Sequence, residues 1–137
     1  MTHEVGSFLE GGSFRYAQSH QNDPLGCSTA MEVIRLMRSE KLVERSKVVG
    51  AKFMEELRRL AKKHDQIKEV RGRGLMIALE FDKNFPPSID TLNSQLLNRG
   101  FVVGMSSPAS LLRFLPPFTI GEQDIIQLIE NLDQILL

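Results

Sequence analysis

Residues that could bind an anion precede the first long helical stretch of the sequence, in the run Ser19-His20-Gln21-Asn22-Asp23-Pro24-Leu25-Gly26-Cys27. Proline is favoured at the first position of a helix, and the backbone N–H groups of a helix start can face an anionic ligand. The hydroxyl of Ser19 is a further donor. A purely structural interpretation is also open, in which Asp23 caps the helix, Pro24 takes its first turn and Ser19 satisfies loop backbone.

Two glycines interrupt an apolar segment further along, in Val70-Arg71-Gly72-Arg73-Gly74-Leu75-Met76. Glycine within a strand permits a bulge or the close approach of another backbone. The segment is a poor phosphate loop, because Gly72-x-Gly74 lacks a third glycine and the sequence contains no G-x-x-x-x-G-K-[ST] motif. It predicts either a strand bulge with two solvated arginines or an anion site at that bulge.

Arg113 is a candidate for binding a carboxylate, in the stretch Leu112-Arg113-Phe114-Leu115-Pro116-Pro117-Phe118-Thr119-Ile120. The planar fork of a guanidinium suits bidentate recognition of a carboxylate. The alternative is an arginine at a strand edge that pairs with a surface carboxylate, which contributes little to stability.

Taken together, the three motifs resemble those of the class III (fold type I) pyridoxal-phosphate aminotransferases. The first resembles the family's Thr-Tyr/Phe-x-Asn-x-Pro pattern, with Ser19 in place of Thr and His20 in place of Tyr or Phe. The second, with its aliphatic run to Glu80, resembles the segment that opens the sheet of the family's small C-terminal domain. The third resembles (Leu/Ile)-Arg-(Phe/Leu)-x-Pro-Pro. The resemblance extends over residues 4–136.

The resemblance implies roles for two residues. Ser19 would bind the phosphate of pyridoxal 5'-phosphate across the interface of a homodimer, and Arg113 would pair with a substrate carboxylate or an active-site Glu. The reaction implied is the transfer of an amino group to a 2-oxo acid. The donor would be an amino acid or ω-amine, such as acetylornithine, ornithine or 4-aminobutyrate.

The chain is expected to lack the family's catalytic residues. The family needs a Lys bound covalently to the cofactor and an Asp that holds its pyridine nitrogen, and both belong to the large domain, upstream of the Ser19 motif. Only 18 residues precede Ser19, and none is Lys. We therefore expect the C-terminal portion of an aminotransferase, with no catalytic residue, no cofactor bound to this chain alone and little or no activity by itself.

Composition and sequence pattern argue against several other classes of protein and site. Lys plus Arg and Asp plus Glu are both 17, which argues against a nucleic-acid surface. No apolar run approaches the roughly 20 residues that span a bilayer, and the N-terminus does not resemble a signal peptide. The single Cys27 fits a reducing cytoplasm and is expected in the core. His3, His20 and His64 are too scattered to predict a metal site.

The elements that must position these motifs follow from the apolar periodicity. Helices are predicted from Pro24, with apolar residues on one face, from Leu42 to about His64, over 89–98 and over 121–136. Strands are predicted over 67–70, 75–81, 101–104 and 111–115, with a turn at 106–110. This order predicts an α+β fold, with a three- or four-stranded sheet, helices on one face and a long helix before it. Residues 1–23 would form an irregular lead-in carrying the phosphate-contact motif, and residues 24–137 the small domain.

A second function from another class remains open on the sequence alone. The chain could be a non-catalytic, stand-alone α+β module that binds a small anion or provides a dimerisation surface. That alternative predicts a ligand at the Gly72/Gly74 bulge or at Arg113, and a folded homo-oligomer without cofactor. An Asp and then a Lys in sequence upstream of the Ser19 motif would favour the aminotransferase instead.

Overall fold

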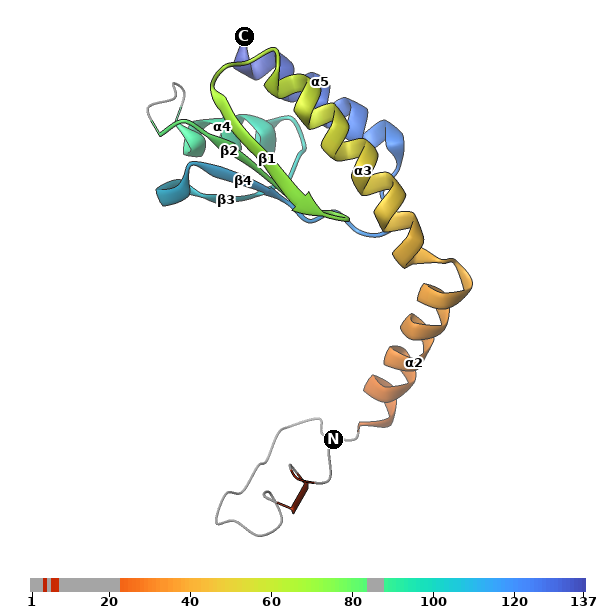
Figure 1. Cartoon of the computed structure of the whole chain (residues 1–137). Coiled ribbons are helices and arrows are strands. Elements are labelled where there is room, and N and C mark those ends of the chain that lie inside the picture. The colour runs from red at the N-terminus through yellow and green to blue at the C-terminus, as the bar shows by residue number, and fades with distance from the viewer. Residues whose placement is uncertain (1–3, 5, 8–22, 84–87) are drawn as a thin grey trace. The chain divides into compact units, whose positions relative to one another are not determined.

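The structure is a computed structural model that describes residues 4, 6–7, 23–83 and 88–137 (Figure 1). It divides into two compact units, Met1–Ser39 and Glu40–Leu137. The elements are α2 (Pro24–Ser39), α3 (Leu42–Ala61), β1 (Ile67–Arg73), β2 (Met76–Phe81), α4 (Ile89–Asn98), β3 (Gly104–Ser106), a short 3-10 helix (Ser107–Ala109), β4 (Leu111–Phe114) and α5 (Glu122–Leu136). Their order confirms the predicted α+β class.

Helix α2 begins at Pro24, as its capping residue predicts. The N–H of Leu25 donates to Oδ1 of Asp23 at 3.1 Å, which satisfies one of the unpaired donors of the first turn. None of the apolar residues that share a face of α2 is buried in the structure. Cys27 is accordingly exposed and not part of a core.

The second unit contains a four-stranded antiparallel sheet in the order β1-β2-β4-β3. Side chains alternate across it, as the period of two in a strand requires. Ile77 and Leu79 of β2 are buried with Phe114 of β4, whereas Met76 on the other face is 69% exposed. One face of the sheet therefore carries the core and the other meets solvent.

Helices α3, α4 and α5 supply the rest of that core. Figure 1 shows α3 and α5 running alongside each other, and both contribute fully buried side chains, Leu57 and Leu132 among them. Leu92 of α4 is equally buried. The rings of Phe53 on α3 and Phe114 on β4 have their centroids 5.4 Å apart. These contacts confirm the prediction of helices on one face of the sheet.

Strand β1 is longer than predicted, because the interruption in the motif is a turn and not a bulge. Residue pairing continues to Arg73 opposite Met76, and Gly74 with Leu75 forms the turn between β1 and β2. Gly74 has φ +56°, a conformation that favours glycine. The irregularity in pairing lies between Ile67 and Glu69.

Strand β3 begins at Gly104, where the sequence analysis predicted a strand over 101–104. Gly104 pairs with Arg113, so residues 101–102 would fall opposite Leu115 and Pro116 if the ladder continued. Proline has no N–H to donate, and β4 ends at Phe114 just before Pro116 and Pro117. The paired region therefore shifts to residues 104–106. Helix α3 also ends earlier than predicted, at Ala61.

Candidate functional site

Arg113 lies on the exposed face of the sheet, one residue before the end of β4. Its cross-strand partners are Ala78 on β2 and Gly104 on β3. The guanidinium makes one long hydrogen bond, from Nη2 to the carbonyl oxygen of Met105 at 3.5 Å. Across the described part of the chain, no carboxylate forms an ion pair with it. The surface ion pair considered in the sequence analysis is therefore absent from these residues, and the residue is exposed.

The cross-strand neighbours of Arg113 are small and leave room for its side chain. A Cβ atom on Gly104 would lie 3.4 Å from Cβ and 3.5 Å from Nε of Arg113, so the side chain runs directly over this glycine. Sequence reasoning did not assign Gly104 a role. A glycine at position 104 indicates a role only once the strand register is known, because the register places it opposite Arg113.

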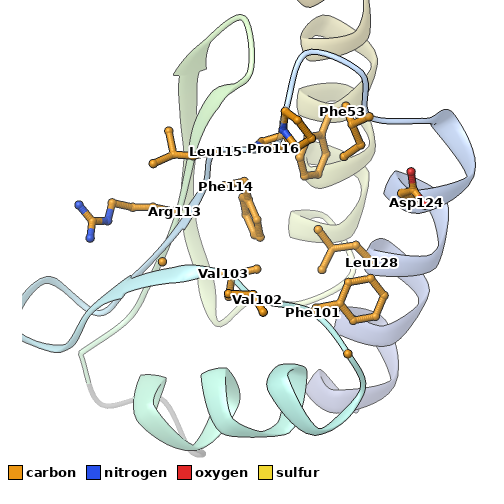
Figure 2. A pocket seen from close by; sticks show the side chains of 14 residues that line it. Phe53, Phe101, Val102, Val103, Arg113, Phe114, Leu115, Pro116, Asp124 and Leu128 are labelled. Atoms are coloured by element: carbon orange, nitrogen blue, oxygen red, sulfur yellow. The ribbon is translucent and has the colours of Figure 1, made fainter. Parts of the chain in front are cut away.

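A cavity of about 310 Å³ opens at the end of the sheet where Arg113 lies (Figure 2). Its lining is mainly apolar, with Phe101, Phe114 and Leu128 among its walls. Figure 2 shows the guanidinium of Arg113 directed away from the ring of Phe114. Asp124 also borders the cavity, but its Oδ2 accepts a hydrogen bond from the N–H of Gly121 at 3.0 Å and caps α5.

These groups favour binding over catalysis. Arg113 and Asp124 are the ionisable side chains that line the cavity, and Asp124 is already engaged in the helix cap. An exposed guanidinium that pairs with no carboxylate of the described residues suits a carboxylate ligand. Because it points away from the ring of Phe114, it would meet such a ligand on the exposed face of the sheet.

Arg45 on α3 is a second arginine close to the cavity. We call residues 115–120, which follow β4, the Pro-Pro segment. Arg45 donates from Nη1 to the carbonyl oxygen of Phe118, and from Nη2 to that of Ile120 at 2.6 Å. Arg45 is half-buried, although a charged residue on a helix is ordinarily expected on its exposed face. No periodicity could predict this contact, because it joins residues more than 70 positions apart.

Arg71 was expected to be solvated, but it belongs to a network of charges on the exposed sheet face. Its Nη1 contacts Glu69 and Glu80 at 2.5 Å each, and Lys68 Nζ contacts Glu80 at 2.8 Å. Hydrogen bonds from Lys68 and then Arg71 lower the pKa of Glu80. Arg71 is thus neutralised by carboxylates, in contrast to Arg113 two strands away.

Gly72 also leaves no room for the anion site that the sequence analysis considered at this motif. A Cβ atom there would lie 2.3 Å from the carbonyl oxygen of Met76. The absence of a side chain at Gly72 is explained by the close approach of β2.

His64 is buried in an ion-paired cluster between α3 and α5. Its Nε2 lies 2.6 Å from Oδ1 of Asp133, and Nζ of Lys63 lies 2.5 Å from Oδ2. Hydrogen bonds from Lys63 and then His64 lower the pKa of Asp133. No group of metal-ligating side chains occurs in the described ranges, whereas His3 and His20 fall outside them.

Ser19, the candidate for the cofactor phosphate, lies outside the described residues. The lysines can all be placed, and each is exposed: Lys41, Lys47, Lys52, Lys62, Lys63, Lys68 and Lys83. An amine that forms a Schiff base with a cofactor requires a desolvated or otherwise activated position. The described residues therefore do not fit the covalent attachment of pyridoxal phosphate.

Comparison with known proteins agrees with the fold and the motifs. The model of the family described as aminotransferase class-III matches residues 1–136. The chain belongs to the class-III aminotransferase family. It is 35% identical over 123 residues to the acetylornithine aminotransferase of Methanosarcina acetivorans, covering 90% of this chain and 29% of that protein. It is 33% identical over 133 residues to the ornithine aminotransferase of Brevibacillus brevis, covering 97% and 31%.

Solved aminotransferases share the fold of this class-III chain. An ornithine aminotransferase of Toxoplasma gondii superposes with a TM-score of 0.81 at 28% identity, covering 97% of this chain and 30% of that one. An aminotransferase of Bacillus anthracis gives a TM-score of 0.84 at 23% identity, covering 98% and 33%. The chain thus spans about a third of the length of the family members it matches. The part of the chain that the structure describes contains no helix long and apolar enough to cross a membrane.

Proposed function

We propose that this chain is the C-terminal portion of a pyridoxal-phosphate-dependent transaminase and that it supplies the carboxylate-binding arginine, Arg113. The reaction moves an amino group from an amino acid or ω-amine to a 2-oxo acid. The observation that carries the proposal is the exposed guanidinium of Arg113, which pairs with no carboxylate among the described residues, in a chain of the class-III family. Alone, the chain is inactive.

In this proposal the chain binds and orients substrate, and the reactive amine lies on polypeptide outside it. Pyridoxal phosphate, when bound, supplies the electron sink for the reaction. Arg113 holds a substrate carboxylate through paired N–H donors and so fixes the distance of the substrate from the sheet. Ser19 donates its hydroxyl to the cofactor phosphate across a homodimer interface. The exposed lysines take no part in the chemistry.

A chimera tests this function. Residues 1–137 would replace the matching segment of the Brevibacillus brevis relative, of which they cover 31%. We expect the chimera to bind pyridoxal phosphate, which its absorbance reports, and to transaminate. Arg113→Ala in the chimera should lower kcat/KM by about tenfold to a hundredfold, because a charge-assisted hydrogen bond to substrate is lost.

The control is Arg59→Ala, which removes an arginine that pairs with Glu55 and Glu56 on its own helix. That variant should keep the kcat/KM of the chimera. A folded, cofactor-loaded chimera that does not transaminate would contradict the proposed function. An active chimera whose kcat/KM is unchanged by Arg113→Ala would contradict the role of this residue.

A further inference from the structure

Arg45 reaches from helix α3 to the wall of the candidate site. We propose that Arg45 is a positioning residue, which fixes the Pro-Pro segment and thereby the end of β4 from which Arg113 meets a carboxylate ligand. The inference rests on the proposed function of Arg113, which it extends by a residue that does not itself touch the ligand.

The contact is specific in its geometry. One guanidinium donates to two main-chain carbonyls, those of Phe118 and Ile120. Between them the chain turns, because the N–H of Ile120 donates to the carbonyl of Pro117 at 3.0 Å. A planar, rigid fork that holds two acceptors from one turn leaves that turn little freedom to rotate or slide.

The Pro-Pro segment has particular need of such a contact. Pro116 and Pro117 have no N–H, so they cannot donate to a continuation of the β4 ladder. The next regular element starts only at Glu122 of α5. Besides its own main-chain bond from Ile120 to Pro117, the segment is held by side-chain hydrogen bonds to its carbonyls, of which Arg45 supplies two.

The same segment shapes the candidate site. Leu115, Pro116, Pro117 and Ile120 line the cavity that Arg113 borders. The segment starts two residues after Arg113, so a shift of the turn moves the cavity wall and pulls on the end of β4. Arg45 is not itself the ligand's partner, because its half-buried guanidinium is already bound to these carbonyls.

Three variants of the full 137-residue chain test the inference. Arg45→Ala removes both bonds, and Arg45→Lys keeps the charge but has a single nitrogen that cannot reproduce the fork. Arg59→Ala, on the same helix but bonded only within it in the described residues, is the matched control. NMR would follow the Nε–H signal of Arg113 and the amides of residues 119–121, and titration with glutarate would give the Kd, with Arg113→Ala as reference.

We expect wild type and Arg59→Ala to bind glutarate through Arg113 with the same Kd. Arg45→Ala should shift the Arg113 and 119–121 signals and raise Kd about fivefold, and Arg45→Lys should lie between. Unfolding in urea would establish that each variant is folded. If Arg45→Ala does not fold, the signals and Kd of Arg45→Lys test the positioning role.

The two proposals fail in different ways. Glutarate binding that is unchanged by Arg45→Ala and Arg45→Lys, or Arg113 signals that do not move in either, overturns the positioning role. If wild type binds no glutarate through Arg113, the carboxylate role in the proposed function is overturned. In that case, shifts of the Arg113 and 119–121 signals in the Arg45 variants still support the positioning role, and unshifted signals overturn it too.

Discussion

Arg113 and Gly104 lie opposite each other on neighbouring strands, and the arginine side chain crosses the bare backbone of the glycine. The room for this side chain is therefore provided by the missing Cβ. Ala78 on the other side of Arg113 is also small. The orientation of the candidate carboxylate-binding group thus depends on residues that never touch a ligand.

Gly104→Val should displace Arg113, because branched methyl groups would occupy the space over which Nε now lies. We expect the Kd for glutarate to rise about fivefold in NMR titration of the full chain. Gly104→Ala is the matched control, since its single Cβ would make ordinary contacts at 3.4 Å and 3.5 Å. Equal affinities in all three proteins would show that Gly104 does not set the position of Arg113.

Glu80 makes the free energy of unfolding depend on pH. Its pKa is lowered in the folded chain by Lys68 and Arg71, so the folded state binds the proton less readily than the unfolded state. This contribution is fully present above the ordinary glutamate pKa of 4.5 and is lost as pH falls through the lowered value.

Glu80→Gln should therefore lower the urea midpoint at pH 7 and flatten its decline below pH 4.5. The comparison uses unfolding curves of both proteins between pH 7 and about pH 2. Glu130→Gln, at an exposed position of α5, should retain the wild-type pH profile. An unchanged acid profile in Glu80→Gln would contradict the role assigned to these ion pairs.

Single residues were predictable from the sequence where the physics is local. Asp23 caps α2 as expected, because a cap involves neighbours within one turn. Arg45 and Gly104 were not predicted as functional, because their partners are set by tertiary packing and strand register.

At the scale of elements, α3 and the β1–β2 hairpin touch backbone to backbone. A Cβ atom on Gly50 of α3 would lie 2.0 Å from the carbonyl oxygen of Gly74 in the hairpin turn. Real Cβ atoms do not approach so closely, and a main-chain carbonyl cannot move without its strand. The missing Cβ of Gly50 therefore sets how closely α3 packs on the hairpin turn.

Gly50→Ala should destabilise the second unit by about 1–3 kcal/mol, because one element must move away from the other. The urea midpoint measures the loss. Gly26→Ala is a suitable control, since its Cβ would meet nothing closer than 3.9 Å and α2 would gain helix propensity. A Gly50→Ala protein as stable as wild type would show that α3 and the hairpin adapt without cost.

The existence and type of the elements could be predicted, and their ends were predicted less well. Periodicity identified α3, α4, α5, β2 and β4 of the second unit, because one face of each carries buried side chains. The end of β1 was misplaced, since a Gly-rich stretch is compatible with a bulge or a turn and only pairing distinguishes them. The start of β3 depends on the prolines that follow its partner strand β4, which no pattern local to β3 reveals.

At the scale of the molecule, the two units differ in the burial of their apolar residues. The second unit has a shared core, whereas α2 keeps Leu25 and Met31 more than 70% exposed. A 16-residue helix without packing is marginally stable in water.

We expect the backbone amides of α2 to exchange about a hundredfold faster than those of α3 in the purified chain, as measured by hydrogen–deuterium exchange. The α3 amides around Phe53 and Leu57 serve as the internal reference, because these side chains are fully buried. Equal protection of both helices would show that α2 is covered in solution.

The family was predictable because three separated motifs occur in the correct order, and the family match over residues 1–136 confirms it. The site was only partly predictable. Arg113 could be named from its motif, but the cavity beside it arises where two strands stop pairing, which is a property of the assembled sheet.

The position of β4 in the sheet bears on when the candidate site forms during folding. Strand β1 meets β2 through a two-residue turn, but β2 meets β4 only after the chain has passed through α4 and β3. Closing that longer loop costs more chain entropy, so contacts of this kind form late. A partly folded chain with α3 and the hairpin in place would not yet have brought Arg113 beside Ala78. Binding at Arg113 therefore reports completion of the whole sheet.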